Sequence, residues 1–148
     1  MKNRLNCILL ADDDIATNFI NKKIIEKANI IEHVHVALNG KEAIEYICNK
    51  GKFESDNNKY PKPEMILLDI NMPVMDGWEF IETYQKLDNA YKQNIVIVML
   101  SSSFNPADKV KAESYAEVAE FRQKPMSRES LLEIICTHFP EIVHEKAL

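Results

Sequence analysis

The stretch MILLD (residues 65–69) sets one carboxylate, that of Asp69, directly after four apolar residues. A short apolar run of this kind is typical of a strand that is covered on both faces of a parallel sheet. Two other charged features also come just after predicted strands. The acidic run DDD (12–14) follows the apolar run 5–10, and Lys124 follows the segment 118–122. Open α/β sheets carry their functional sites where strands end, so we expect these charges to meet at one edge. A lysine that joins several carboxylates favours chemistry on a phosphoryl group with a divalent cation.

Five strand candidates alternate with five helix candidates along the chain. The strands are expected at residues 5–10, 33–36, 65–68, 95–100 and 118–122. The segment 33–36 reads His-Val-His-Val, and this period of two predicts a half-exposed edge strand. Strands and helices that alternate at these lengths predict an α/β fold with a parallel sheet and right-handed crossovers.

The first predicted helix follows the acidic run directly. Asp14 is expected to cap it, and Ile15, Phe19, Ile20 and Ile24 recur at helical spacing after the cap. The next three helices are expected to open at Asn39-Gly40, after the turn 75–77 and near Pro106, and a final helix is expected to carry Leu131, Leu132, Ile134 and Ile135.

Residues 50–63 separate the second predicted helix from the third predicted strand. The segment is polar and contains two prolines, and it is longer than most connections in a fold of this kind. We therefore expect an exposed, mobile loop.

The composition bounds the class of protein. With 148 residues, of which 46% are hydrophobic and 28% charged, the chain is expected to form one domain over residues 1–148. A net charge of −5 argues against direct nucleic-acid binding, which needs clustered basic side chains. No segment is apolar enough for a membrane span or a signal peptide, and the three cysteines show no CxxC pairing. These features predict a cytoplasmic protein with reduced thiols in or near the core.

Four motifs together resemble the receiver domain of two-component response regulators. They are ILLADDD (8–14), MILLDINMPVMDG (65–77), VIVMLSSS (96–103) and FRQKP (121–125). They occur in the order and spacing of that family, and the resemblance covers roughly residues 5–139. It implies a flavodoxin-like, doubly wound five-stranded parallel sheet, (βα)5, with strand order 2-1-3-4-5. It also implies a single-domain receiver similar to chemotaxis regulators, with no output domain.

The resemblance implies a role for each charged residue of the predicted edge. Asp69 matches the phosphoacceptor, a carboxylate nucleophile that forms an acyl phosphate. Asp12 and Asp13 match the acidic pair that holds Mg²⁺ together with Asp69 and the backbone carbonyl of Asn71, and Asp13 is the preferred direct ligand of the pair. Lys124 matches the lysine that neutralises phosphoryl charge.

Two further residues match the family's switch. Ser101 stands at the switch hydroxyl, which donates to a phosphoryl oxygen and draws the following loop inward. Phe121 stands at the switch aromatic, although plain core packing explains a phenylalanine there equally well. Lys124-Pro125 matches a pair that is commonly joined by a cis peptide bond. One departure is Glu117, which replaces the glycine usually found between the fourth helix and the fifth strand.

The resulting hypothesis is a stand-alone receiver that is not an enzyme. It would take a phosphoryl group from a histidine kinase or a histidine phosphotransfer protein and change its contacts with an unidentified protein target. Whether phosphorylation also promotes a homodimer stays open. The alternative is an interaction module on the same fold that works without phosphorylation. A haloacid-dehalogenase-type phosphatase is disfavoured, because the position of its general acid is Asn71, which has no proton to give a leaving group.

Overall fold

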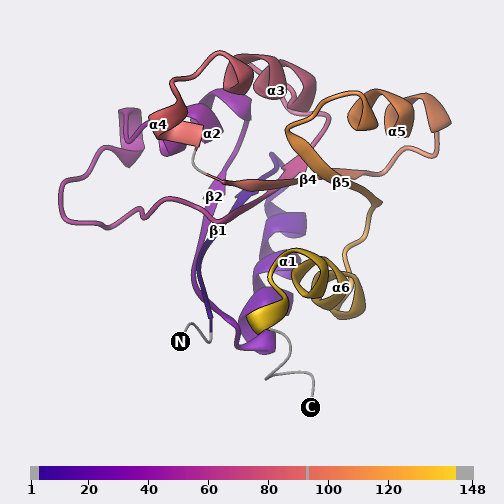
Figure 1. Ribbon diagram of the computed structural model, residues 1–148, viewed down its shortest axis with the longest axis horizontal. Coiled ribbons are helices and arrows are strands. Elements are labelled where there is room, and N and C mark those ends of the chain that lie inside the picture. The colour runs from indigo at the N-terminus through magenta and orange to yellow at the C-terminus, as the bar shows by residue number, and fades with distance from the viewer. Residues whose placement is uncertain (1–3, 93, 143–148) are drawn as a thin grey trace.

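A five-stranded parallel sheet forms the centre of the computed structural model, which describes residues 4–92 and 94–142 (Figure 1). The strand order is β2-β1-β3-β4-β5, as the resemblance implied. The strands are β1 (Leu5–Ala11), β2 (Ile31–Ala37), β3 (Met65–Asp69), β4 (Val96–Ser101) and β5 (Val118–Gln123). The predicted α/β class and the 2-1-3-4-5 order are therefore confirmed.

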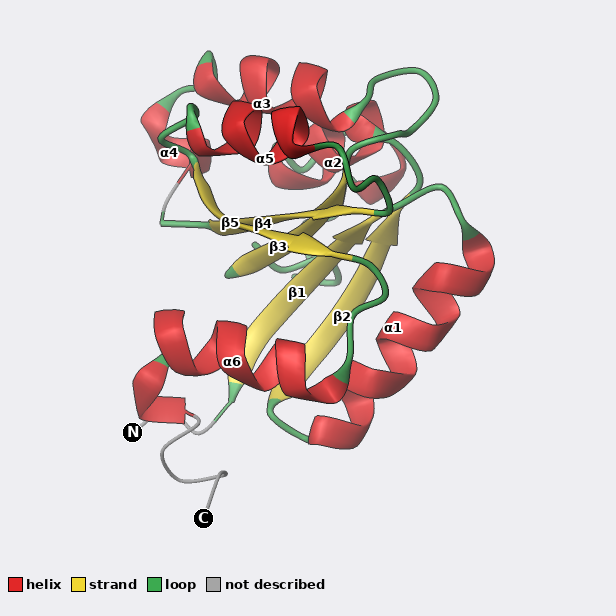
Figure 2. Cartoon of the chain, turned by 90° about the vertical axis from the view of Figure 1, so that its right-hand side faces the viewer, coloured by secondary structure: helices red, strands yellow, loops and turns green. Residues whose placement is uncertain are grey.

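Helices cover both faces of the sheet (Figure 2). Helices α1 (Ile15–Ala28) and α6 (Arg128–His138) lie on one face. The other face carries α2 (Gly40–Ile47), α3 (Gly77–Gln85), α4 (Asn89–Lys92) and α5 (Pro106–Glu113). The single-turn α4 and the short 3₁₀ helix η1 (Gly51–Phe53) were not predicted. Covering on both faces explains why the central strands read as nearly unbroken apolar runs.

The edge strand β2 and the central strand β3 are both longer than predicted. The strand predicted at 33–36 extends over the whole of β2, because Ile31 pairs with Leu5 and Ala37 pairs with Ala11 along the full length of β1. Asp69, predicted to follow its strand, is the last residue of β3 and pairs with Leu100. Its carboxylate is thus held by sheet geometry rather than by a loop.

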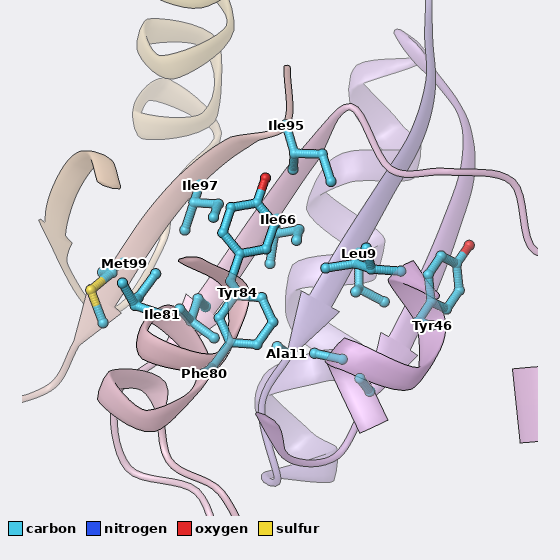
Figure 3. Packing of buried hydrophobic residues seen from close by; sticks show 14 of the residues in the cluster. Leu9, Ala11, Tyr46, Ile66, Phe80, Ile81, Tyr84, Ile95, Ile97 and Met99 are labelled. Atoms are coloured by element: carbon cyan, nitrogen blue, oxygen red, sulfur yellow. The ribbon is translucent and has the colours of Figure 1, made fainter. Parts of the chain in front are cut away.

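The hydrophobic core is divided by the sheet into two clusters. On the α2/α3 side, Leu9 and Ile66 from the central strands face Phe80, Ile81 and other apolar side chains of α3 (Figure 3). Each large apolar side chain that is fully buried in this way contributes roughly 1.5–3 kcal/mol to stability. These clusters fix the helices against the sheet and hold the strand ends in register.

Side chains at the predicted helix starts accept hydrogen bonds from the first turns. Asp14 accepts from the backbone of Ala16 and Thr17, as predicted. Asp76 accepts from the backbone N–H of Glu79 at 2.9 Å, and the Glu79 carboxylate accepts from that of Asp76 at 3.0 Å. This reciprocal capping box fixes the start of α3 directly after the β3 edge.

Helix α1 buries a different stripe from the one that its apolar pattern indicates. Ile15, Phe19 and Ile20 are 77%, 63% and 56% exposed. The buried residues of the helix are Asn18, Asn21 and Ile25, whose three- and four-residue spacing defines one face. The apolar spacing located the helix correctly but not the face that packs on the sheet.

The loop 50–63 is anchored at both ends. Most of residues 54–59 are exposed, as predicted, but Phe53 is buried and packs edge-on against Tyr46 and Tyr60 at ring distances of 4.9 and 5.2 Å. The Tyr46 hydroxyl donates to the carbonyl of Pro61 at 2.9 Å. The expectation of an exposed loop is therefore wrong at these aromatic anchors.

Two expectations from composition concern membranes and thiols. Within the described ranges, no helix is both long enough and apolar enough to cross a bilayer. Cys7, Cys48 and Cys136 are free thiols; Cys7 is buried and Cys48 is half-buried, but Cys136 is exposed, so the expectation of core or near-core thiols is wrong for Cys136.

Val74 adopts a left-handed backbone conformation in the connection between β3 and α3. Its φ is +67°, and the backbone N–H of Met75 donates to the carbonyl of Pro73 at 2.7 Å around it. The Val74 side chain is exposed and gains no packing in return. A β-branched residue is strained at positive φ.

We expect Val74→Asn to stabilise the folded chain by about 1 kcal/mol, since asparagine tolerates the left-handed region far better than valine. Urea unfolding should show a higher midpoint at an unchanged slope. Val110→Asn is the matched control, because Val110 is also exposed but lies within helix α5. An equal shift in both variants would refute the assignment of strain to Val74.

Candidate functional site

Three carboxylates meet at the carboxyl edge of the sheet. Asp12 follows the last residue of β1, Asp13 comes next, and Asp69 ends β3. Carboxylate oxygens from the three side chains lie within 4.8 Å of one another. Asp12 and Asp69 are 5% and 7% exposed, whereas Asp13 is open to solvent. The edge thus joins two buried acidic groups to one accessible group.

Lys124 reaches the same edge from the end of β5. Its backbone N–H donates to the carbonyl of Ser101 at 2.8 Å, which continues the pairing of β5 with β4. Its ammonium Nζ lies 2.7 Å from Asp12 Oδ2 and 3.0 Å from Asp69 Oδ1. The peptide bond between Lys124 and Pro125 is cis, as the resemblance implied. The ammonium of Lys124 therefore forms ion pairs with two carboxylates.

The charges at this edge are not balanced. Burial raises the pKa of Asp69, and the neighbouring carboxylates of Asp12 and Asp13 raise it further, while the hydrogen bond from Lys124 acts in the opposite direction. Burial alone would lower the pKa of Lys124, but its hydrogen bonds to Asp12 and Asp69 outweigh burial and raise it. Lys124 is thus held as an ammonium, and three carboxylates face this single cation.

The donor set suits a hard divalent cation. Mg²⁺ prefers carboxylate and carbonyl oxygens and needs few of them from the protein. Both oxygens of Asp12 are already engaged, Oδ1 by the backbone N–H of Asp14 at 2.9 Å and Oδ2 by Lys124. In the described part of the chain, the side chain of Asp13 and the carbonyl of exposed Asn71 accept no hydrogen bond. Asp13, whose two carboxylate oxygens are free among the described residues, and Asp69 lie close enough together to accept a cation.

Ser101 and Phe121 lie next to the acidic edge but differ in their surroundings. Ser101 ends β4 and is 1% exposed, and its Oγ accepts from the backbone N–H of Ser103 at 3.0 Å. Phe121 is half-buried, pairs with Met99 across β4 and β5, and packs against the α2/α3 core cluster. Its surroundings are compatible with both of the predicted readings, a switch aromatic and a core residue.

Gly77 allows α3 to begin directly against the site. A Cβ atom at this position would lie 2.6 Å from the carbonyl oxygen of Asp69 and 2.9 Å from the Cα of Ile70. The backbone N–H of Gly77 donates to the carbonyl of Ile70 at 2.7 Å. Any side chain here would push α3 away from the end of β3.

Asn18 contacts the site and was missed from the sequence. Its side-chain Nδ2 donates to the backbone carbonyl of Asp12 at 2.8 Å. The available signal was the pair Asn18 and Asn21, two uncharged polar residues three positions apart in the same helix. Such a pair marks a buried polar stripe once the helix face is known.

Residues 8–136 match the family described as the response regulator receiver domain. The chain belongs to this family. A receiver domain is a module of two-component signalling and is not a catalytic enzyme in the usual sense, so the resemblance inferred from the four motifs is confirmed. The acidic triad of Asp12, Asp13 and Asp69 is typical of receiver domains.

Curated relatives of this receiver domain differ in length. The response regulator Rcp1 of Synechocystis sp. is 28% identical over 101 residues, which is 68% of this chain and 65% of that protein. The probable transcriptional regulator ycf29 of Porphyra purpurea is 28% identical over 130 residues, covering 88% of this chain and 54% of that protein. The chain thus spans between half and two thirds of these relatives.

Solved structures show the same receiver fold. A two-component response regulator from Cytophaga hutchinsonii is 28% identical with a TM-score of 0.78, covering 93% of this chain and 98% of that one. The bacteriophytochrome response regulator AtBRR is 29% identical with a TM-score of 0.75, covering 91% and 93%. The Mn²⁺-bound form of Rcp1 is 21% identical with a TM-score of 0.67, covering 95% and 88%.

We expect Asp69→Asn to raise the free energy of unfolding at pH 7 when no divalent cation is present. The pKa of Asp69 is raised on folding, so its ionised form opposes folding at any pH above that raised pKa. The gain should shrink as the pH falls through the raised pKa. It should vanish below the ordinary value of 3.8, where Asp69 is protonated in both states.

Urea unfolding of wild type and variant at a series of pH values measures this difference. Asp56→Asn, on the exposed part of the 50–63 loop, controls for the loss of one surface charge. A wild type that is the more stable protein at pH 7 would contradict the expected repulsion among the three carboxylates.

Proposed function

We propose that the chain is a cytoplasmic phosphoacceptor that takes a phosphoryl group on Asp69 and signals through altered protein contacts. The donor is a histidine kinase or a histidine phosphotransfer protein. The observation that carries this proposal is the position of Asp69, a buried carboxylate 3.0 Å from Lys124 and within 4.8 Å of two further carboxylates. A sensor kinase of Helicobacter pylori, CheAY, is 30% identical over 129 residues and agrees with a two-component setting.

The transfer needs one nucleophile and much charge neutralisation. A carboxylate oxygen of Asp69 attacks the phosphorus of the donor's phosphohistidine. The new P–O bond forms as the P–N bond breaks, and the imidazole leaves with the electron pair. Lys124 already contacts Asp69 and lies close enough to neutralise the charge on the transferred group.

Asp13, Asp69 and the carbonyl of Asn71 would hold Mg²⁺ beside the acceptor. The cation would neutralise phosphoryl oxygens and relieve the repulsion among the carboxylates. The Mn²⁺-bound structure of Rcp1, a protein of the same fold, supports a divalent cation in this role. Asp12 would support the site by orienting Lys124 rather than by offering a free oxygen.

The output would start at Ser101. Its hydroxyl can turn from the local turn with Ser103 toward a phosphoryl oxygen on Asp69, and the loop that follows β4 would move with it. Phe104 on this loop and Val110 on α5 are exposed apolar side chains. This surface would contact the downstream protein or a second copy of the chain, and half-buried Phe121 lies on β5 beside α5.

The donor would approach across α1. Ile15 directly follows the acidic run, and its side chain and those of Phe19 and Ile20 are exposed. Exposed apolar groups beside a reacting carboxylate suit contact with another protein. Contact with a protein donor would therefore account for the exposure of these apolar side chains on α1.

Incubation with acetyl phosphate and Mg²⁺ should add one phosphoryl group to the wild type, as detected by intact-protein mass spectrometry. The adduct should be absent without Mg²⁺ and absent in Asp69→Asn, which lacks the nucleophile. Lys124→Ala should still bind Mg²⁺ but respond poorly to phosphorylation.

A phosphorylated Asp69→Asn protein would exclude Asp69 as the acceptor. A wild type that gains no adduct, beside a receiver of known activity treated in parallel, would favour the interaction module that works without phosphorylation.

Phe19→Ser should slow phosphoryl transfer from a protein donor about tenfold or more, because it removes an aromatic contact from the docking surface. Transfer from acetyl phosphate, which needs no docking surface, should be unchanged. Val110→Ser is the control, since it removes an exposed apolar side chain from α5 instead. Equal rates from the protein donor for wild type and Phe19→Ser would remove α1 from the docking surface.

A further inference from the structure

Helix α1 buries two asparagines on the face where amphipathic helices carry apolar side chains. Asn18 and Asn21 are each 6% exposed. The Nδ2 of Asn18 donates to the carbonyl of Asp12, while its Oδ1 is buried with no hydrogen-bond partner in the described part of the chain. A buried acceptor without a partner costs free energy. An asparagine that bears this cost beside the acidic edge points to a role for the bond that its amide donates.

The bond from Asn18 controls the orientation of one peptide plane. The carbonyl of Asp12 belongs to the planar unit that joins Asp12 to Asp13. Fixing this carbonyl fixes the plane, and the plane fixes the position of the Asp13 Cα from which its side chain departs. Asp13 is exposed and its carboxylate makes no hydrogen bond to any described residue, so among the described contacts only those of the backbone hold the residue in place.

The other polar groups of Asp12 are fixed by different partners. Its backbone N–H donates to the carbonyl of Ala37 at 3.0 Å, and its carboxylate contacts the backbone of Asp14 and the ammonium of Lys124. Among these described contacts, Asn18 holds only the backbone carbonyl of Asp12. That residue is in turn fixed by the helix, since its backbone N–H donates to the carbonyl of Asp14 at 3.0 Å.

We propose that Asn18 is a positioning residue for the divalent cation. Through the carbonyl of Asp12 it holds the Asp12–Asp13 peptide in the orientation that aims Asp13 at the cation, and it keeps this orientation before the cation arrives. The proposal rests on the proposed function, because it assigns Asp13 as a direct ligand. Hydrogen bonds that orient metal ligands in this way typically contribute tenfold or more to metal affinity.

Calorimetric titration with MgCl₂ tests the proposal on wild type, Asn18→Leu and Asn21→Leu. We expect Asn18→Leu to bind Mg²⁺ about tenfold more weakly than wild type. Asn21→Leu is a matched control: the residue is buried to the same extent in the same helix, yet its side chain has no hydrogen bond to the acidic edge. It should keep wild-type affinity. Asn18→Ala, which removes the amide without adding bulk, provides a second variant should leucine not fit.

Phosphorylation by acetyl phosphate over a range of MgCl₂ separates positioning from general damage. Asn18→Leu should need about tenfold more Mg²⁺ for the half-maximal rate and should reach the wild-type maximal rate at saturation. Urea unfolding without Mg²⁺ should leave Asn18→Leu no less stable than Asn21→Leu.

Two results would overturn the proposal. Equal Mg²⁺ affinity in wild type and both Asn18 variants would show that Asn18 does not aim Asp13. A lower maximal rate at unchanged Mg²⁺ dependence would place Asn18 in the transfer step or in stability instead. A wild type that binds no Mg²⁺ is a separate result, since it would also refute the metal site of the proposed function.

Discussion

The ammonium of Lys124, shared between Asp12 and Asp69, is the contact on which the carboxyl edge depends. It joins the ends of β1, β3 and β5, which are far apart in the sequence, at distances of 2.7 and 3.0 Å. The carboxylates of Asp12 and Asp69 lie within 4.8 Å of each other, and like charges at this range repel strongly where water is excluded. The ammonium of Lys124 offsets part of this repulsion between the two buried aspartates. The sheet topology brings the carboxylates of Asp12 and Asp69 close together, and the ammonium of Lys124 reduces the repulsion between them.

The same contact leaves the edge incompletely neutralised. One ammonium faces three carboxylates, and Asp13 is the member that remains open to solvent. A cation bound at this edge, as proposed, would relieve the repulsion among the carboxylates.

Much of the fold and the site could be predicted because strong local signals lie at strand ends and helix starts. Asp69 after its apolar run, Asp14 as a helix cap and the Lys124-Pro125 pair each occupy the predicted position. The buried face of α1 could not be predicted, because the exposed Phe19 and its neighbours carry the apolar pattern while Asn18 faces the sheet. Helical spacing identifies a helix, but only tertiary contacts determine which stripe is buried.

The 50–63 loop shows the same limit of local pattern. Its polar composition predicted exposure, yet Phe53 and Tyr60 tie its ends to Tyr46 through ring contacts that join residues far apart in sequence. The left-handed conformation of Val74 was equally hidden, because a β-branched residue normally argues against positive φ. In both cases the surrounding structure overrides the preference of the residue.

The anchored loop has a practical consequence for work on this chain. It leads into the amino end of β3, whereas Asp69 ends that strand at the opposite edge of the sheet. Figure 1 shows the loop projecting from the side of the sheet away from α5. Its aromatic anchors isolate the exposed residues 54–59 from the core. A fluorophore or an affinity tag inserted there would leave the acidic edge at the other end of β3 unobstructed.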